Sequence, residues 1–377
     1  MNKTKLGSKL KLSIILVAVL TATILGGCSK DTDKENDTDA GSKTQVTETE
    51  TDIEDSQEAD QSVENNDVQE TDEINEDDNE KITINIAALK GPTGMGMVKL
   101  MEDAENGNAT NDYKFTVAGE ADIISTGLVK GDFDIAAVPC NLASVLYNKT
   151  EGQIKTIAIN TLGVLYIVET GDSIGTVEDL RGKTIYSTGY GTTPQFTLYH
   201  LLSINGIDPE KDVNIEYKSE ATEVAALLEN ATDSIAMLPQ PYVTTVMMNN
   251  DKVRIALDIE KEWTMQNEDG SGVVTGVVVV NKEFLENNPE AVEAFMEEYC
   301  ESANFVNENI DEAATLIEKH EIFKAAVAKK AIPFCNITFI SGQEMKEKVE
   351  AYLTVLYNQN PKAVGGEMPA EDFYYVQ

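Results

Sequence analysis

The sequence predicts an α/β protein with two lobes, each built around a doubly wound sheet. The chain has 377 residues, too many for one ordinary domain and enough for two hydrophobic cores. From Lys81 onward, apolar residues alternate between strand-like and helix-like spacing in two successive series. After Asn281 the pattern is almost entirely helical, which predicts a helical cap at the C-terminal end.

Residues 1–27 are predicted to be an export signal. Several lysines precede an apolar run from Ser13 to Gly27, which at about fifteen residues is short for a membrane-spanning helix. The run ends in Leu25-Gly26-Gly27-Cys28, which resembles the bacterial lipobox. That resemblance implies that Cys28 becomes a lipidated N-terminus carrying palmitate-type acyl chains, which hold a protein on the membrane. The alternative is an ordinary signal peptide with an incidental cysteine.

Residues 28–80 are predicted to be a disordered acidic tether. Between Asp31 and Glu80 the chain has 21 acidic residues, two lysines and no aromatic residue. Such a segment cannot bury enough apolar surface to offset its ordering entropy, and its charges repel one another. It either holds the folded part away from the membrane or is a solvated tail without a further role. Nucleic-acid binding is disfavoured, because residues 81–377 still carry 45 acidic against 22 basic residues.

The first series of elements begins with isoleucines at period two, Ile82 to Ile86, followed by a glycine-rich break. Strands are predicted at 82–89, 113–118, 134–139, 154–159 and 164–168, with helices after 97, 123 and 141.

The second series begins with a short helix capped by Thr176, with Asp179 at the capping-box position. Thr193 followed by Pro194 predicts a helix start, with Thr193 as the cap. Strands are predicted at 183–187, 213–217, 234–238, 253–259 and 273–280, with helices between them, and helices alone thereafter.

Cysteine and histidine are too sparse to predict a metal site or a cofactor. Three cysteines follow Cys28 (Cys140, Cys300 and Cys335), and an odd number cannot form a complete disulfide set, so small buried side chains are expected. There is no CxxC motif, and the two histidines, His200 and His320, are far apart in the sequence.

The middle of the chain resembles a known family. The segment VEDLRGKTIYSTGYGTTPQFTLYHLLSINGIDPEKDVNI (Val177–Ile215) resembles the signature of type II periplasmic binding proteins of the nitrate/sulfonate/taurine and thiamine-precursor (NMT1-like) group. Gly131–Lys149, Glu223–Met247 and Val277–Asn309 resemble further elements of that group, in the same order. The resemblance covers about Ile82 to Pro361.

This resemblance implies a type II periplasmic-binding-protein fold with ligand in the cleft between the lobes. Lobe 1 would comprise residues 81–170 and 276–377, including C-terminal helices packed on it, and lobe 2 residues 171–275. The chain would cross between the lobes near Val168–Asp172 and Val274–Val277.

Four loops that follow strands are the predicted ligand site, because ligands of doubly wound sheets bind beyond the carboxyl ends of strands. Each loop also has a purely structural interpretation: a tight turn, a helix cap by Asn141 or Thr193, or a tyrosine packed on its own helix. A nucleophilic role for Cys140 is disfavoured, because no histidine lies in its motif. The candidate residues are Thr93, Gly94 and Met95; Cys140 and Asn141; Ser187, Thr188, Tyr190, Thr192 and Thr193; and Gln240 and Tyr242.

None of these loops contains arginine, so backbone amides and hydroxyls would hold a sulfonate-like anion, and a pyrimidine or other aromatic metabolite fits equally well. The lone Trp263 either closes over a ligand ring or packs between the lobes.

The predicted function is solute capture on the outer face of the cell membrane by a lipid-anchored, monomeric protein. The expected partners are an ABC permease and ATPase, which recognise the closed form after a hinge motion. A solute-sensing lipoprotein without a transporter is the first alternative. An enzyme on the same fold is the second and is disfavoured, because export and lipidation separate the chain from cytoplasmic metabolism.

Overall fold

The computed structural model describes residues 81–266 and 271–376. The predicted signal peptide, the lipidation site Cys28 and the acidic tether all lie outside the described residues. None of the helices in the described part of the chain combines the length and the hydrophobicity that crossing a lipid bilayer would require.

The first of two sheets has six strands in the order β11-β4-β10-β3-β1-β2. Strand β1 runs parallel to β2 and β3, so Ile86 lies between Phe115 and Ile135. Strand β10 is antiparallel to both of its neighbours, β3 and β4. The strand bounds are β1 Thr83–Leu89, β2 Asp112–Ala118, β3 Ile135–Pro139, β4 Ile154–Thr161, β10 Gly276–Asn281 and β11 Ile337–Ser341.

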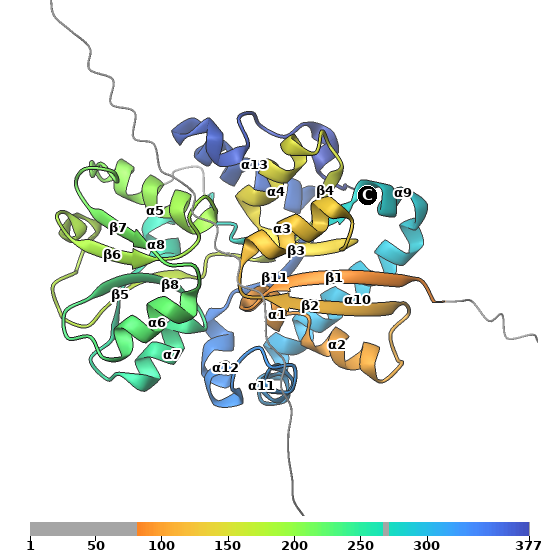
Figure 1. Ribbon diagram of the computed structural model, residues 1–377, viewed down its shortest axis with the longest axis horizontal. Helices are drawn as coiled ribbons and strands as arrows, with labels where there is room; N and C mark the ends of the chain where they lie inside the picture. The colour runs from red at the N-terminus through yellow and green to blue at the C-terminus, as the bar shows by residue number, and fades with distance from the viewer. Residues whose placement is uncertain (1–80, 267–270, 377) are drawn as a thin grey trace, which may run out of the picture. The chain divides into compact units, whose positions relative to one another are not determined.

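Helices cover both faces of this sheet (Figure 1). Val278 and Val280 of β10 face one hydrophobic cluster, while Val277 and Val279 face the other, which explains the unbroken apolar run. One face is covered by α2 (Val98–Glu105), α10 (Pro289–Glu308), α11 (Ile310–Lys319) and α12 (Ala325–Ala331), and the other by α3 (Ala121–Lys130), α4 (Cys140–Lys149) and α13 (Gly342–Gln359). Shorter helices are α1 (Pro92–Met95), α9 (Lys282–Asn287), η2 (Ile332–Phe334), η3 (Pro361–Val364) and η4 (Glu371–Phe373).

The second sheet has five strands in the order β7-β6-β8-β5-β9, again with helices on both faces. Strand β6 is parallel to β7 and β8, whereas β5 is antiparallel to β8 and β9. The strands are β5 Leu165–Glu169, β6 Thr184–Ser187, β7 Asn214–Tyr217, β8 Ile235–Pro239 and β9 Arg254–Asp258. The helices are η1 Val177–Leu180, α5 Thr193–Ile204, α6 Ala221–Glu229, α7 Tyr242–Asn249 and α8 Ile259–Thr264.

The first crossing between the sheets lies earlier than the sequence predicts. Strand Leu165–Glu169 pairs with β8 and β9, so it belongs to the second sheet, and the crossing is at 162–164 instead of Val168–Asp172. The strand is buried throughout and apolar except for Glu169, so its sequence does not indicate which of the two sheets it joins. The second crossing precedes Gly276, where β10 joins the first sheet.

Two further details differ from the sequence analysis. Thr192 is the N-cap of α5, and Thr193 is the first helical residue, because the Thr193 hydroxyl bonds to Asn141 instead of to its own helix. Trp263 lies in α8, although the sequence around it (Glu262–Gly272) is polar and predicts a loop. It is fully buried and packs between His200 of α5 and Tyr352 of α13, so it is a packing residue between the two lobes.

Candidate functional site

A cavity of about 380 Å³ lies where the ends of strands from both sheets meet. Its walls come from residues just beyond the carboxyl ends of β1, β2 and β3 in one sheet, and of β6, β7 and β8 in the other. The residues next to both crossings, Thr161, Val164, Thr275 and Gly276, complete the lining. This is the place where doubly wound sheets bind ligands, and the volume suits a small molecule.

Local sequence explains how the loop after β6 forms its part of the wall. Gly189 has φ of 74°, and a Cβ there would lie 2.7 Å from the Thr192 hydroxyl oxygen, so only glycine fits. Thr192 Oγ1 donates to the Gly189 carbonyl at 2.8 Å, which closes the turn before α5. Gly191 donates its amide to Gln195 Oε1 at 2.6 Å. The loop therefore has a fixed conformation at the start of α5.

Six of the twelve predicted ligand-binding residues line the cavity. Gln240 is buried and accepts hydrogen bonds from the Thr244 amide and hydroxyl, so its side chain also holds the start of α7. Tyr242 packs against Phe323, and desolvation raises its pKa to about 12, so it remains a neutral phenol at physiological pH. The six are Thr93, Thr188, Tyr190, Thr192, Gln240 and Tyr242. Their contact with a ligand remains a prediction.

The other six predicted residues do not line the cavity. Met95 and Cys140 are fully buried in the hydrophobic clusters of the first sheet. Burial raises the pKa of the Cys140 thiol, which does not suit a nucleophile. Asn141 and Thr193 are buried and bond to each other across the two lobes. Gly94 and Ser187 are also buried, and the Ser187 hydroxyl donates to the Thr188 carbonyl.

Four charged residues in the cavity wall were not among those predicted from the sequence: Lys90, Glu120, Asp122 and Lys218. They follow β1, β2 and β7, so the rule of strand carboxyl ends would have found them if applied to every strand. Lys218 Nζ lies 3.5 Å from Glu216 Oε2 and 5.5 Å from the centre of the Tyr186 ring. The wall thus offers two positive and two negative charges to a ligand.

A glycine lets the two lobes approach each other beside the cavity. A Cβ on Gly119, which follows β2, would lie 2.8 Å from Glu220 Oε1 at the start of α6. Glu220 Oε2 accepts a hydrogen bond from the Thr222 hydroxyl at 2.8 Å, which fixes the carboxylate. A side chain at position 119 would therefore displace the Glu220 carboxylate.

A known protein family and several solved structures are similar to this chain. Residues 152–313 match the sequence profile of the NMT1/THI5-like family. A search of curated proteins found no match. An ABC transporter structure from Parabacteroides distasonis is 24% identical, with a TM-score of 0.65, over 79% of this chain and 100% of that one.

Two more solved structures are similar at lower identity. The alkanesulfonate-binding protein SsuA from Xanthomonas axonopodis pv. citri, bound to MOPS, is 12% identical with a TM-score of 0.64, covering 79% of this chain and 99% of that chain. The nitrate-binding protein NrtA from Synechocystis is 14% identical with a TM-score of 0.57, covering 74% of this chain and 82% of that chain.

The chain has the type II periplasmic-binding-protein fold. The predicted resemblance to the NMT1-like group is thereby confirmed. In this fold the cavity lies between two sheets that are joined by two short crossings.

Proposed function

We propose that this protein is the extracytoplasmic solute-binding component of an ABC importer. The observation that carries the proposal is the cavity of about 380 Å³, whose walls come from strand ends of both sheets. A ligand that contacts both walls stabilises the arrangement in which the lobes are close together. Closure of two lobes around a ligand by a hinge motion is common among two-lobed binding proteins.

The similar structures support a small polar solute. One is described as binding alkanesulfonates and another as binding nitrate. In this chain, the start of α5, α6 and α7 adjoins the cavity, and the free amides of helix N-termini favour anionic groups. Tyr190 and Tyr242 add aromatic surface. A sulfonate-like anion or a pyrimidine-type metabolite is therefore the proposed cargo.

The proposal includes a lipid anchor at Cys28 and a tether that lets a monomer reach a membrane permease. The lipobox-like end of the apolar run and the acidic composition that follows it support this part.

Thermal unfolding of the full-length protein in detergent, with and without candidate solutes, tests the proposal. The panel holds sulfonates, nitrate, pyrimidines, flavins and amino acids. A solute at about 100 times its dissociation constant adds about 2.7 kcal/mol of stability, which is a readily measured shift. A shift confined to one chemical class is the expected result.

A pair of variants locates the binding. Ser219→Trp places a bulky ring in the cavity wall and should abolish the shift, whereas Ser203→Trp, on the exposed side of α5, should keep it. Equal shifts in both variants would place the solute elsewhere. A folded protein that responds to no solute in the panel would overturn the proposed cargo classes.

A further inference from the structure

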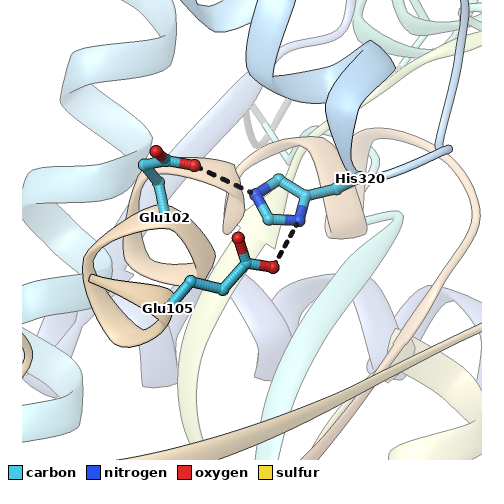
Figure 2. A group of neighbouring side chains, drawn as sticks. All are labelled: Glu102, Glu105 and His320. Atoms are coloured by element: carbon cyan, nitrogen blue, oxygen red, sulfur yellow. Dashed lines mark ion pairs between the residues drawn. The ribbon is translucent and has the colours of Figure 1, made fainter. Parts of the chain in front are cut away.

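Figure 2 shows three side chains that meet outside the cavity: Glu102, Glu105 and His320. The two glutamates lie one turn apart on α2, and His320 immediately follows α11. One potential ligand atom from each residue lies within 4.8 Å of those of the other two. More than two hundred residues separate the histidine from the glutamates, so only the folded chain brings this group together.

His320 is largely buried, and one of its two ring nitrogens, Nε2, lacks a hydrogen-bond partner in the described part of the chain. The His320 side chain is only 10% exposed. Nε2 lies 3.8 Å from Glu102 Oε2, and Nδ1 lies 3.6 Å from Glu105 Oε1. Both distances are too long for hydrogen bonds. A buried polar atom without a partner is costly and calls for a ligand or a water.

The spacing suits a small divalent cation. Zinc bonds to imidazole nitrogen and carboxylate oxygen at about 2.0–2.1 Å, so two ligand atoms of a tetrahedral site lie roughly 3.3 Å apart. The two short separations involve different ring nitrogens, which cannot bind the same ion. With one nitrogen and one oxygen from each glutamate, the three atoms lie within 4.8 Å of one another, and the two flexible glutamate side chains would close the remaining gap around an ion. One imidazole with two carboxylates favours Zn²⁺ over Mg²⁺ or Ca²⁺, which prefer oxygen ligands alone.

Lys319 pairs with both glutamates. Its Nζ pairs with Glu102 Oε2 and lies 2.9 Å from Glu105 Oε2. The lysine is 45% exposed, so its ammonium group can turn into solvent when a cation arrives, at the small cost of a surface ion pair.

We propose that His320, Glu102 and Glu105 form a zinc site in which Lys319 competes with the metal. His320 Nε2 and one oxygen from each glutamate would be the protein ligands, and water would complete the coordination. The bound ion would join α2 to the turn between α11 and α12. This proposal does not depend on the transport function.

Zinc titration of the full-length protein by calorimetry tests the site. The expected result is one site that is weakened at least tenfold in His320→Ala and in Glu105→Gln, since each variant removes a ligand. Glu105 is 55% exposed, so its conservative replacement should leave folding intact. The acidic N-terminal segment is the same in all variants, and a Mg²⁺ titration measures binding to carboxylates alone.

Lys319→Met provides the sharpest measurement, because removing the competing ammonium should tighten zinc binding several-fold. Lys324→Met is the matched control: Lys324 pairs with Glu318 nearby and is 82% exposed, so its loss should leave zinc affinity unchanged. Absorption bands of tetrahedral Co²⁺ that disappear in His320→Ala would identify the nitrogen ligand. Zinc binding that is unaffected by His320→Ala, or no binding above the Mg²⁺ background, would reduce the cluster to an ion-pair network and overturn the proposal.

Discussion

Two glutamates of the second lobe, the buried Glu169 and the half-buried Glu260, show how the surroundings of one residue type decide its charge. Burial opposes ionisation of Glu169, but hydrogen bonds from Ile174 and Ser173, together with Arg254, outweigh it and lower the pKa of Glu169. For Glu260, desolvation is the dominant influence and raises the pKa, although the Val273 amide donates to it. The number of donors, not burial alone, decides the direction.

Glu169→Gln should lower the free energy of unfolding by about 1–3 kcal/mol at pH 7, because the charged acceptor of several hydrogen bonds is lost. The folded-state pKa of Glu169 is depressed, so its stabilising contribution is complete above the ordinary glutamate pKa of about 4.3 and is lost as the pH falls through the folded value. Urea unfolding at pH 7 and at about pH 3 checks both claims, since the gap between wild type and variant should shrink in acid.

The control for this prediction is Glu178→Gln, which breaks an exposed ion pair with Arg181 in the same lobe. Exposed pairs contribute about 0–1 kcal/mol, so this variant should unfold nearly as the wild type does. A gap between Glu169→Gln and wild type that is the same at both pH values would show that the charge of Glu169 does not stabilise the fold.

At the scale of elements, most strands and helices could be predicted from hydrophobic period and turn residues. Among the strands, the exception is β11, at Ile337–Ser341, which lies in a region predicted to be all helical. It is a short edge strand that pairs with β4, more than 170 residues earlier, and with no other strand in the described part of the chain. Most of its residues are half-buried. Pairing with a strand distant in the sequence stabilises β11, so no local sequence pattern predicts it.

The position of the candidate site could be predicted from the sequence, but the set of residues that line it could not. The rule of strand carboxyl ends predicts loops that contribute to the cavity wall, because parallel strands share that edge. Whether a loop residue faces the cavity or the core depends on the packing of distant segments. Asn141, for example, is covered by Ala363, and Met95 by the hydrophobic cluster of the first sheet. Lys218 lies in a loop after β7 that was predicted only as a connection, and Lys90 directly precedes the glycine-rich loop that was predicted to bind ligand.

The two crossings between the lobes are packed around Glu260. A Cβ on Gly163 would lie 2.3 Å from Glu260 Oε2 and 2.8 Å from its Cβ, and one on Gly272 would lie 2.7 Å from Oε1. Because Glu260 is enclosed by both segments, its side chain has little room to move. The crossings can therefore approach each other only where glycine leaves space.

Gly163→Ala should lower the free energy of unfolding by about 1–3 kcal/mol, the usual cost of adding a methyl group to a packed site. The control is Gly175→Ala, where the added Cβ would meet only the Asp179 carboxylate at an ordinary 3.7 Å. Chemical denaturation of both variants measures the difference. Equal stability of the two variants would mean that the crossing relaxes freely around Glu260.

At the scale of the whole molecule, one buried side chain connects the two lobes and the C-terminal segment. Asn141 at the start of α4 donates to the Ala363 carbonyl at 2.9 Å and to the Gly191 carbonyl at 3.3 Å. Its Oδ1 accepts from the Thr193 hydroxyl at 3.2 Å. The Asn141 side-chain amide thus stabilises the arrangement in which the cavity walls face each other, although Asn141 does not line the cavity itself.

Asn141→Ala should therefore weaken the association of the lobes more than it weakens either lobe. The matched control is Ser144→Ala on the same helix, because Ser144 is equally buried and donates only to Val364 in the C-terminal segment. Both variants leave a buried acceptor unpaired, so both should lose about 1–3 kcal/mol of stability. Hydrogen exchange distinguishes them: amides at the start of α5 should exchange faster only in Asn141→Ala, because that variant alone frees Thr193. The same exchange rate at those amides in both variants would contradict this prediction. It would mean that packing such as that of Trp263 holds the lobes together and that the Asn141 hydrogen bonds do not contribute to closure.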